Sequence, residues 1–217
     1  MKPVAPARPA TRPRTRSTAR TATAEQILDL AEMLIQTRSY SAFSYQDIAD
    51  ALGITKASIH YHFASKAALG AAVVDRYVGR IEAAMTAMDR DDATSSIAML
   101  EFYMTPYQAF ADTPDRVCLC GALAGELMTL PPEIRARVER FFRSHQAWLA
   151  GILARGAKRK EFALAAPPAQ MAHLMLGALQ GALLVKRTTG DSAQMNDVVK
   201  VLKAQLRGGR RAASDSR

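Results

Sequence analysis

The chain has little cysteine and no long apolar run. Cys118 and Cys120 are the only cysteines among its 217 residues, which is too few for a disulfide framework and is typical of a reducing compartment. No apolar stretch reaches the roughly 18 residues that a membrane span requires. The basic N-terminal residues lack the apolar segment of a secretory signal. We therefore expect a cytoplasmic protein that does not enter a membrane.

The chain also lacks the common motifs of enzymes. Phosphate-binding loops and glycine-rich nucleotide motifs are missing, and the four histidines show neither a zinc spacing nor a triad arrangement. His60 and His62 lie two residues apart on a predicted helix, so their rings point about 200° apart and cannot share an ion. We predict that the protein is not an enzyme and has no cofactor and no metal site.

Positive charge is concentrated at the two ends of the chain, whose formal net charge is +9. Residues 1–22 contain no acidic residue, and the segment from residue 203 onward contains one, so the middle of the chain is close to neutral. Basic ends on a neutral body suggest a polyanionic partner such as DNA, although solvated tails have the same composition. We predict a disordered basic arm over residues 1–22 and a disordered basic tail over 207–217. The basic residues of these ends are Lys2, Arg8, Arg12, Arg14, Arg16, Arg20, Lys203, Arg207, Arg210, Arg211 and Arg217.

Three helices within about 45 residues are predicted between residues 23 and 70, and a fourth follows them. The first begins with a capping box of Thr23 and Gln26, and the second begins at Ser44 with Asp47 three residues later. Gly53 supplies the permissive backbone that ends the second helix. Two short helices joined by such a turn predict a helix-turn-helix domain over residues 23–70. The predicted N-caps are Thr23, Ser44, Thr55 and Ser65.

The rest of the chain keeps a helical pattern without a convincing strand, so the predicted fold class is all-α. Helices are expected over residues 93–111, 116–129, 133–158, 169–188 and 192–206. Pro106 is expected to kink the first of these. Together they predict a larger helical domain over residues 71–206.

Residues 43–66 resemble the DNA-binding module of the TetR family of transcriptional regulators. The resemblance rests on Ala49 and Gly53 around the turn, on Tyr61-His62-Phe63 at the end of the third helix, and on Ser65-Lys66 at the start of the fourth. It implies a dimeric regulator that binds double-stranded operator DNA and responds to a small molecule. It also implies phosphate-anchoring roles for Thr55, Ser58, Tyr61, His62 and Lys66.

The third helix has a composition that suits base reading. A recognition helix enters the major groove by its N-terminal end. Lys56 can donate to guanine, and Ala57 is small enough to contact a thymine methyl. His60 lies one turn further on, and Ser44 completes the predicted DNA-binding set. Alternatively, Tyr61, His62 and Lys66 are ordinary surface or core residues.

Aromatic and methionine residues between 93 and 188 predict a ligand pocket. Such a pocket needs apolar walls with a few polar groups, although the same spacing also occurs in an ordinary helical core. The predicted lining is Met99, Phe102, Tyr103, Tyr107, Phe110, Leu123, Trp148, Met171 and Met175.

The segment from Cys118 to Glu126, with Leu130-Pro131 after it, resembles the sensor helix of TetR relatives that respond to electrophiles or acrylate-like compounds. This resemblance implies a ligand-sensing role for Cys118 and, by proximity, for Cys120. A helix N-terminus favours the thiolate of a nearby cysteine. The alternatives are two small core residues or a copper(I) site, which would require the helix to begin after Cys120.

Small residues on the helix predicted over 169–188 suggest a dimer interface. Gly177, Ala178 and Gly181 allow close backbone approach, with Leu174 and Leu184 beside them. The resemblance implies that this helix and the next pair with their copies in a four-helix bundle, although the same residues also suit packing within one subunit. A two-fold dimer predicts a palindromic operator with half-sites about 34–36 Å apart. Ala182 is expected on the same small-residue face, and Leu179 and Leu183 are expected to flank it.

These observations predict a ligand-responsive, homodimeric transcriptional regulator. Release of a repressor from its operator by a small molecule, including a thiol-reactive electrophile, is the favoured mechanism. The two alternatives are a thiol-dependent enzyme and an architectural protein that binds DNA without sequence preference.

Overall fold

The computed structural model describes residues 16–91, 93–113 and 115–212, and all regular elements in these ranges are helical. The α-helices are α1 (Arg16–Arg38), α2 (Tyr45–Leu52), α3 (Lys56–His62), α4 (Lys66–Asp89), α5 (Ser96–Ala109), α6 (Leu119–Gly125), α7 (Pro132–Lys158), α8 (Pro168–Thr189) and α9 (Ala193–Ala212). Two short 3₁₀ helices are Phe110–Asp112 and Leu127–Thr129. The predicted all-α class is confirmed.

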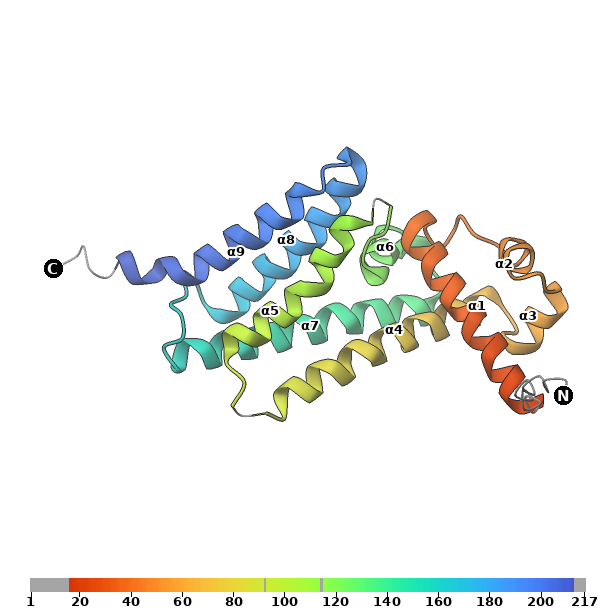
Figure 1. Cartoon of the computed structure of the whole chain (residues 1–217), viewed down its shortest axis with the longest axis horizontal. Coiled ribbons are helices and arrows are strands. Elements are labelled where there is room, and N and C mark those ends of the chain that lie inside the picture. The colour runs from red at the N-terminus through yellow and green to blue at the C-terminus, as the bar shows by residue number, and fades with distance from the viewer. Residues whose placement is uncertain (1–15, 92, 114, 213–217) are drawn as a thin grey trace, which may run out of the picture.

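Helices α1, α2 and α3 form a small domain at one end of an elongated molecule (Figure 1). Local sequence explains their boundaries. The predicted capping box is present at the start of α2, where the Ser44 side chain accepts from the backbone N–H of Asp47 and the Asp47 carboxylate accepts from that of Ser44. Gly53 ends α2 with a φ of 63°, the left-handed conformation that glycine adopts without steric cost. The Thr55 hydroxyl then caps α3, as predicted.

The first helix starts earlier than predicted. It begins at Arg16, so Thr23 and Gln26 lie inside α1 and form no capping box, and residues 16–22 belong to a helix. Alanines at positions 19, 22 and 24 explain this difference, because alanine has the highest helix propensity. The remaining residues of the predicted arm lie outside the described part of the chain.

Two further boundaries differ from the prediction. Helix α9 continues to Ala212, so residues 207–212 are helical, and residues 213–217 of the predicted tail are outside the described residues. The single helix expected over 116–129 is shorter: α6 begins after Cys118, which is its N-cap residue, and a 3₁₀ turn follows it. Arg116 therefore precedes the helix, and its side chain bonds Gln36 of α1.

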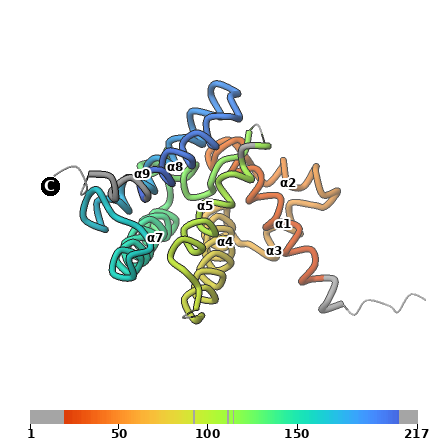
Figure 2. The backbone as a smooth tube through the Cα atoms, turned by 60° about the vertical axis from the view of Figure 1, so that its left-hand side comes forward, coloured from red at the N-terminus to blue at the C-terminus, as the bar shows by residue number. Residues whose placement is uncertain are grey.

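The larger domain contains α4 to α9, with α7 packed along both α4 and α8 (Figure 2). Helix α4 runs from the small domain into the large one, and buried residues of both domains form one continuous hydrophobic cluster. Helix α8 is, by length and composition, the one described helix that could span a membrane. Its Leu176, Leu179 and Leu183 are buried in the protein core.

Candidate nucleic-acid interface and ligand cavity

The N-terminal half of α3 faces solvent at the outer end of the small domain (Figure 1). Ile59 is fully buried and anchors the helix against the domain core. Lys56, Ala57 and Tyr61 are exposed, and Tyr61 shows 62% of its surface. The Arg20 guanidinium of α1 lies 4.9 Å from the centre of the Tyr61 ring. One surface therefore combines a lysine, a small residue, an exposed phenol and an arginine.

Several of the other predicted DNA-binding residues have partners within the protein. The hydroxyls of Ser44 and Thr55 serve as helix caps, and the half-buried Ser58 donates its backbone N–H to Thr55 Oγ1 at 3.1 Å. The His60 ring lies 4.8 Å from the ring of Tyr45, with its Nδ1 3.3 Å from the carbonyl oxygen of Ala64. These contacts hold the side chains at the ends of α2 and α3 in defined positions.

His62 and Lys66 are less accessible than Tyr61. His62 is half-buried and packs edge-on against the Tyr61 ring at 5.3 Å. Lys66 donates from Nζ to the carbonyl oxygen of Phe43 at 2.5 Å, and its ammonium lies 4.6 Å from the centre of the Tyr40 ring. Burial lowers the pKa of Lys66 from its ordinary value. This lysine therefore stabilises the segment between α1 and α2.

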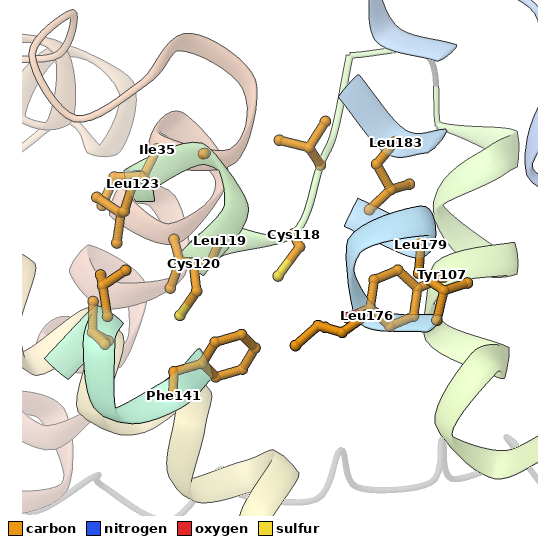
Figure 3. Packing of buried hydrophobic residues seen from close by; sticks show 14 of the residues in the cluster. Ile35, Tyr107, Cys118, Leu119, Cys120, Leu123, Phe141, Leu176, Leu179 and Leu183 are labelled. Carbon is orange, nitrogen blue, oxygen red and sulfur yellow. The ribbon is translucent and has the colours of Figure 1, made fainter. Parts of the chain in front are cut away.

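The large domain contains a partly open cavity of about 350 Å³ between α4, α5 with the 3₁₀ turn after it, α7 and the segment before α6. Five of the residues predicted to line the ligand pocket or to sense the ligand do line it: Phe102, Tyr103, Tyr107, Phe110 and Cys118. In Figure 3, Cys118, Tyr107 and Phe141 approach this space from three different segments. Sequence analysis missed the other lining residues, which are Tyr77, Arg80, Ile81, Ala84, Met85, Pro106, Phe141 and His145.

The remaining predicted pocket residues lie outside the cavity lining. Met99, Leu123, Met171 and Met175 are buried in the core, and Trp148 is half-buried with its Nε1 donating to Asp89 Oδ2 at 2.7 Å. Cys120 is fully buried and does not line the cavity. Its surroundings raise the pKa of its thiol well above the ordinary value through loss of solvation.

The polar groups around the cavity are joined by hydrogen bonds. The Tyr77 hydroxyl donates to Cys118 Sγ at 3.6 Å, and the hydroxyl of Tyr103 is 2.9 Å from His145 Nδ1. Burial lowers the pKa of His145 to about 4, so its imidazole is neutral at pH 7. The cavity therefore has apolar walls, a thiol with a neighbouring hydroxyl donor, and an uncharged imidazole.

The missed residues had a weak signal in the sequence. Tyr77, Arg80 and Ile81 have the i, i+3, i+4 spacing of one helix face, and Phe141 and His145 are four residues apart on α7. The same spacing describes any packed helix face, so only the tertiary arrangement shows that these two faces meet at a cavity.

Helix α6 connects the cavity with the DNA-binding domain. Cys118 lines the cavity immediately before the helix, and Glu126 lies immediately after it. The Glu126 carboxylate accepts hydrogen bonds from the backbone N–H groups of Tyr40 at 2.6 Å and Ser41 at 2.9 Å. These two residues form the turn between α1 and α2. A short helix thus has one end at the cavity and the other end on the helix-turn-helix domain.

Helix α8 has an exposed face that contains the predicted interface residues. Leu174 and Leu184 are exposed by 53% and 46%, and a Cβ atom added to Gly177 or Gly181 would meet nothing within 4 Å. Ala178 is half-buried on this helix. Val185, beside Leu184, is 46% exposed, and Val201 of α9 is 57% exposed. Ala182, predicted on this face, and the predicted flanking residues Leu179 and Leu183 are instead buried within the subunit.

Among the described residues, no group of three or more histidine, cysteine, aspartate or glutamate side chains is arranged to hold a metal ion. Both cysteines are free thiols.

Comparison with known proteins assigns both domains. Residues 27–73 match the family described as bacterial regulatory proteins, tetR family, and residues 97–202 match the tetracyclin repressor-like C-terminal domain. The HTH-type transcriptional repressor DhaR of Mycobacterium sp. (strain GP1) is 25% identical over 167 residues, which cover 76% of this chain and 83% of that protein.

Solved structures agree with this assignment. A TetR-family transcriptional regulator from Agrobacterium tumefaciens is 30% identical with a TM-score of 0.81, and the match covers 87% of this chain and 99% of that one. A TetR regulator from Legionella pneumophila is 29% identical with a TM-score of 0.74, over 85% and 97% of the two chains. Sequence, domain order and three-dimensional structure therefore agree: the chain belongs to the TetR family of transcriptional regulators.

Proposed function

We propose that this regulator is a cytoplasmic, homodimeric repressor that leaves a palindromic operator when a small molecule occupies the cavity beside Cys118. The Mycobacterium relative is named a transcriptional repressor, which supports repression rather than activation. The exposed residues Lys56, Ala57 and Tyr61 read or anchor the DNA. The exposed faces of α8 and α9, with Leu174, Gly177 and their neighbours, pair two subunits.

The position of α6 is the observation that carries this proposal. Atoms of Cys118 line the cavity, and the carboxylate of Glu126 holds the turn before α2. A ligand that displaces the start of α6 also displaces Glu126, because seven helical residues connect them rigidly. The turn at Tyr40 and Ser41 then changes the orientation of α2 and α3. Couplings of this kind are typically worth about 1–3 kcal/mol.

The thiol gives the effector a chemical class, namely a small electrophile. The Cys118 sulfur adds to an activated carbon–carbon double bond: the π bond breaks, a carbon–sulfur bond forms, and the proton given up by the thiol is balanced by the proton that the adjacent carbon takes up. No group leaves and no oxidant is needed. The Tyr77 hydroxyl, 3.6 Å from the sulfur, is the hydrogen-bond donor next to the reacting atom.

Alkylation with N-ethylmaleimide tests this function. An operator is first selected from random duplex DNA, and its fluorescence anisotropy is then followed while the protein is modified. We expect one equivalent to react and the DNA to dissociate, and we expect Cys118→Ser to remain bound. Cys120→Ser is the matched control and should respond like the wild type, because Cys120 lies outside the cavity. Continued turnover of the maleimide would favour an enzyme, and equal release of the Cys118→Ser variant would exclude the thiol mechanism.

A further inference from the structure

The cavity beside Cys118 has a single permanently charged side chain on its wall. Arg80 is that residue, and the other lining side chains are aliphatic, aromatic, the thiol, and His145, which is neutral at pH 7. The exposed surface of the cavity is almost entirely apolar, and the Arg80 guanidinium is paired with Glu32. By turning inward, Arg80 could bind the one anionic group of a ligand with an apolar body. Arginine suits a carboxylate in particular, because its planar guanidinium presents parallel N–H donors.

Arg80 retains donors that its present partner does not use. Its contacts with Glu32 of α1 both involve Nη2, at 2.7 Å to Oε1 and 2.8 Å to Oε2. The N–H groups on Nε and Nη1 are therefore not taken by that carboxylate. The Arg80 side chain is 52% exposed, whereas that of Glu32 is only 10% exposed. The guanidinium also lies 5.9 Å from the centre of the Tyr77 ring, which lines the same cavity.

Glu32 has a second cation. Arg76 donates from Nη2 to Glu32 Oε2 at 3.1 Å and also pairs with Glu25 and Asp29 of α1. If Arg80 turned toward a ligand, the Glu32 carboxylate would keep Arg76 as its partner. Arg80 can therefore exchange partners without leaving a buried charge unpaired, which would otherwise be costly.

We propose that Arg80 binds the acidic group of the effector, so that the cavity takes a small, mainly apolar organic acid. This inference rests on the proposed function in that the cavity is taken as the effector site. The acid competes with Glu32 for Arg80, so its binding removes one of the two arginines that join α4 to Glu32 of α1. Binding at this subsite would therefore change a contact of α1, the first helix of the helix-turn-helix domain.

Binding of 3-phenylpropanoate and 3-phenylpropanamide to the full-length protein tests the subsite. The two probes share one carbon skeleton and differ in charge, and neither carries a double bond that could alkylate Cys118. Affinities are measured by calorimetry in the absence of DNA. The fluorescence of Trp148, the only tryptophan, shows whether the probe binds in the cavity, because the Trp148 ring lies 5.6 Å from the ring of the cavity residue Tyr103. We expect the acid to bind about tenfold more tightly than the amide in the wild type at low salt.

Two arginine variants distinguish a direct contact between Arg80 and the acid from a general effect of positive charge near the cavity. Arg80→Gln should bind the two probes with affinities within about twofold of each other. Arg76→Gln removes a charge from the same Glu32 network without touching the cavity, and it should keep the preference for the acid. In the wild type, added salt should weaken acid binding more than amide binding, a result that needs no variant.

The proposal would be overturned if the wild type bound the acid and the amide equally or bound neither probe. It would also be overturned if the preference for the acid survived in Arg80→Gln or were lost equally in Arg76→Gln. Because these measurements involve neither DNA nor alkylation, their failure is distinguishable from failure of the proposed function. An acid that binds at Arg80 while N-ethylmaleimide leaves the operator complex intact would exclude the thiol mechanism alone.

Discussion

The Glu126 carboxylate accepts a hydrogen bond of 2.6 Å from the backbone N–H of Tyr40, across 86 positions of the chain. The bond joins the end of α6 to the turn that leads into α2. A second bond from the Ser41 N–H to the same carboxylate fixes its orientation. This pair of bonds is a direct polar connection between the larger helical domain and the helix-turn-helix domain.

Replacing Glu126 by alanine should weaken this connection. Charge-assisted hydrogen bonds contribute about 1.5–3 kcal/mol each, and water can partly replace them at this half-buried site. We expect Glu126→Ala to lower the free energy of unfolding by about 1–3 kcal/mol and to reduce effector-induced operator release. Chemical denaturation and anisotropy measure the two effects. Glu139→Ala is the control, because Glu139 pairs with Arg143 on the exposed surface and should change stability by less than about 0.5 kcal/mol. Full release by Glu126→Ala would show that α6 acts by another route.

Lys56→Ala tests the assignment of α3 as the recognition helix. Lys56 is exposed at the first position of α3, so its loss should leave stability within about 0.5 kcal/mol of the wild type. A lost guanine contact should weaken operator binding by about 1–3 kcal/mol and reduce discrimination against random DNA. Lys158→Ala, on the exposed surface of α7, should change neither. Unaltered discrimination in Lys56→Ala would contradict base reading by this residue.

Gly177→Glu tests the dimer interface on α8. A side chain at this position meets nothing within the subunit, so the monomer should fold, while paired charges should prevent association. We expect analytical ultracentrifugation to show a monomer with weak operator affinity. Gly151→Glu is a matched control on α7, because Gly151 is also exposed and has no neighbour within 4 Å of its Cβ position. A dimer that persists in Gly177→Glu would place the interface elsewhere.

Because His145 is buried at the cavity, we expect the free energy of unfolding to fall at acidic pH. The pKa of His145 is about 4 in the folded protein against about 6.5 when unfolded. Above pH 6.5 neither state binds the proton; between pH 6.5 and 4 the unfolded state binds it first, so stability falls as pH falls. The loss due to His145 should reach about 2 kcal/mol at pH 5. Denaturation at pH 7 and pH 5 should show a smaller difference in His145→Gln, and equal differences would contradict this burial effect.

Features encoded by neighbouring residues could be predicted from the sequence. Ser44 with Asp47, Thr55 and Gly53 act within four positions of the backbone groups they satisfy, so their roles follow from local spacing. The start of α1 at Arg16 could not be located in this way, because a good cap at Thr23 competes with an alanine-rich helix that simply continues. Local signals therefore located the helix-turn-helix domain well and one of its boundaries poorly.

Features that depend on tertiary contact could not be predicted. Cys118 and Cys120 are two positions apart and both are buried, yet only Cys118 lines the cavity, because the chain enters α6 between them. The contacts of Glu126 with Tyr40 and of Arg80 with Glu32 join segments distant in sequence. No spacing rule relates such pairs, so the coupling between the domains required the structure.

The most direct test of the account is DNase I protection of an operator selected from random duplex DNA. Two copies of α3, held by the α8 and α9 interface, should contact successive major grooves on one side of the helix. The protected sequence should be a palindrome with two half-sites about 34–36 Å apart. Continuous protection without a preferred sequence, or a single unpaired site, would contradict it.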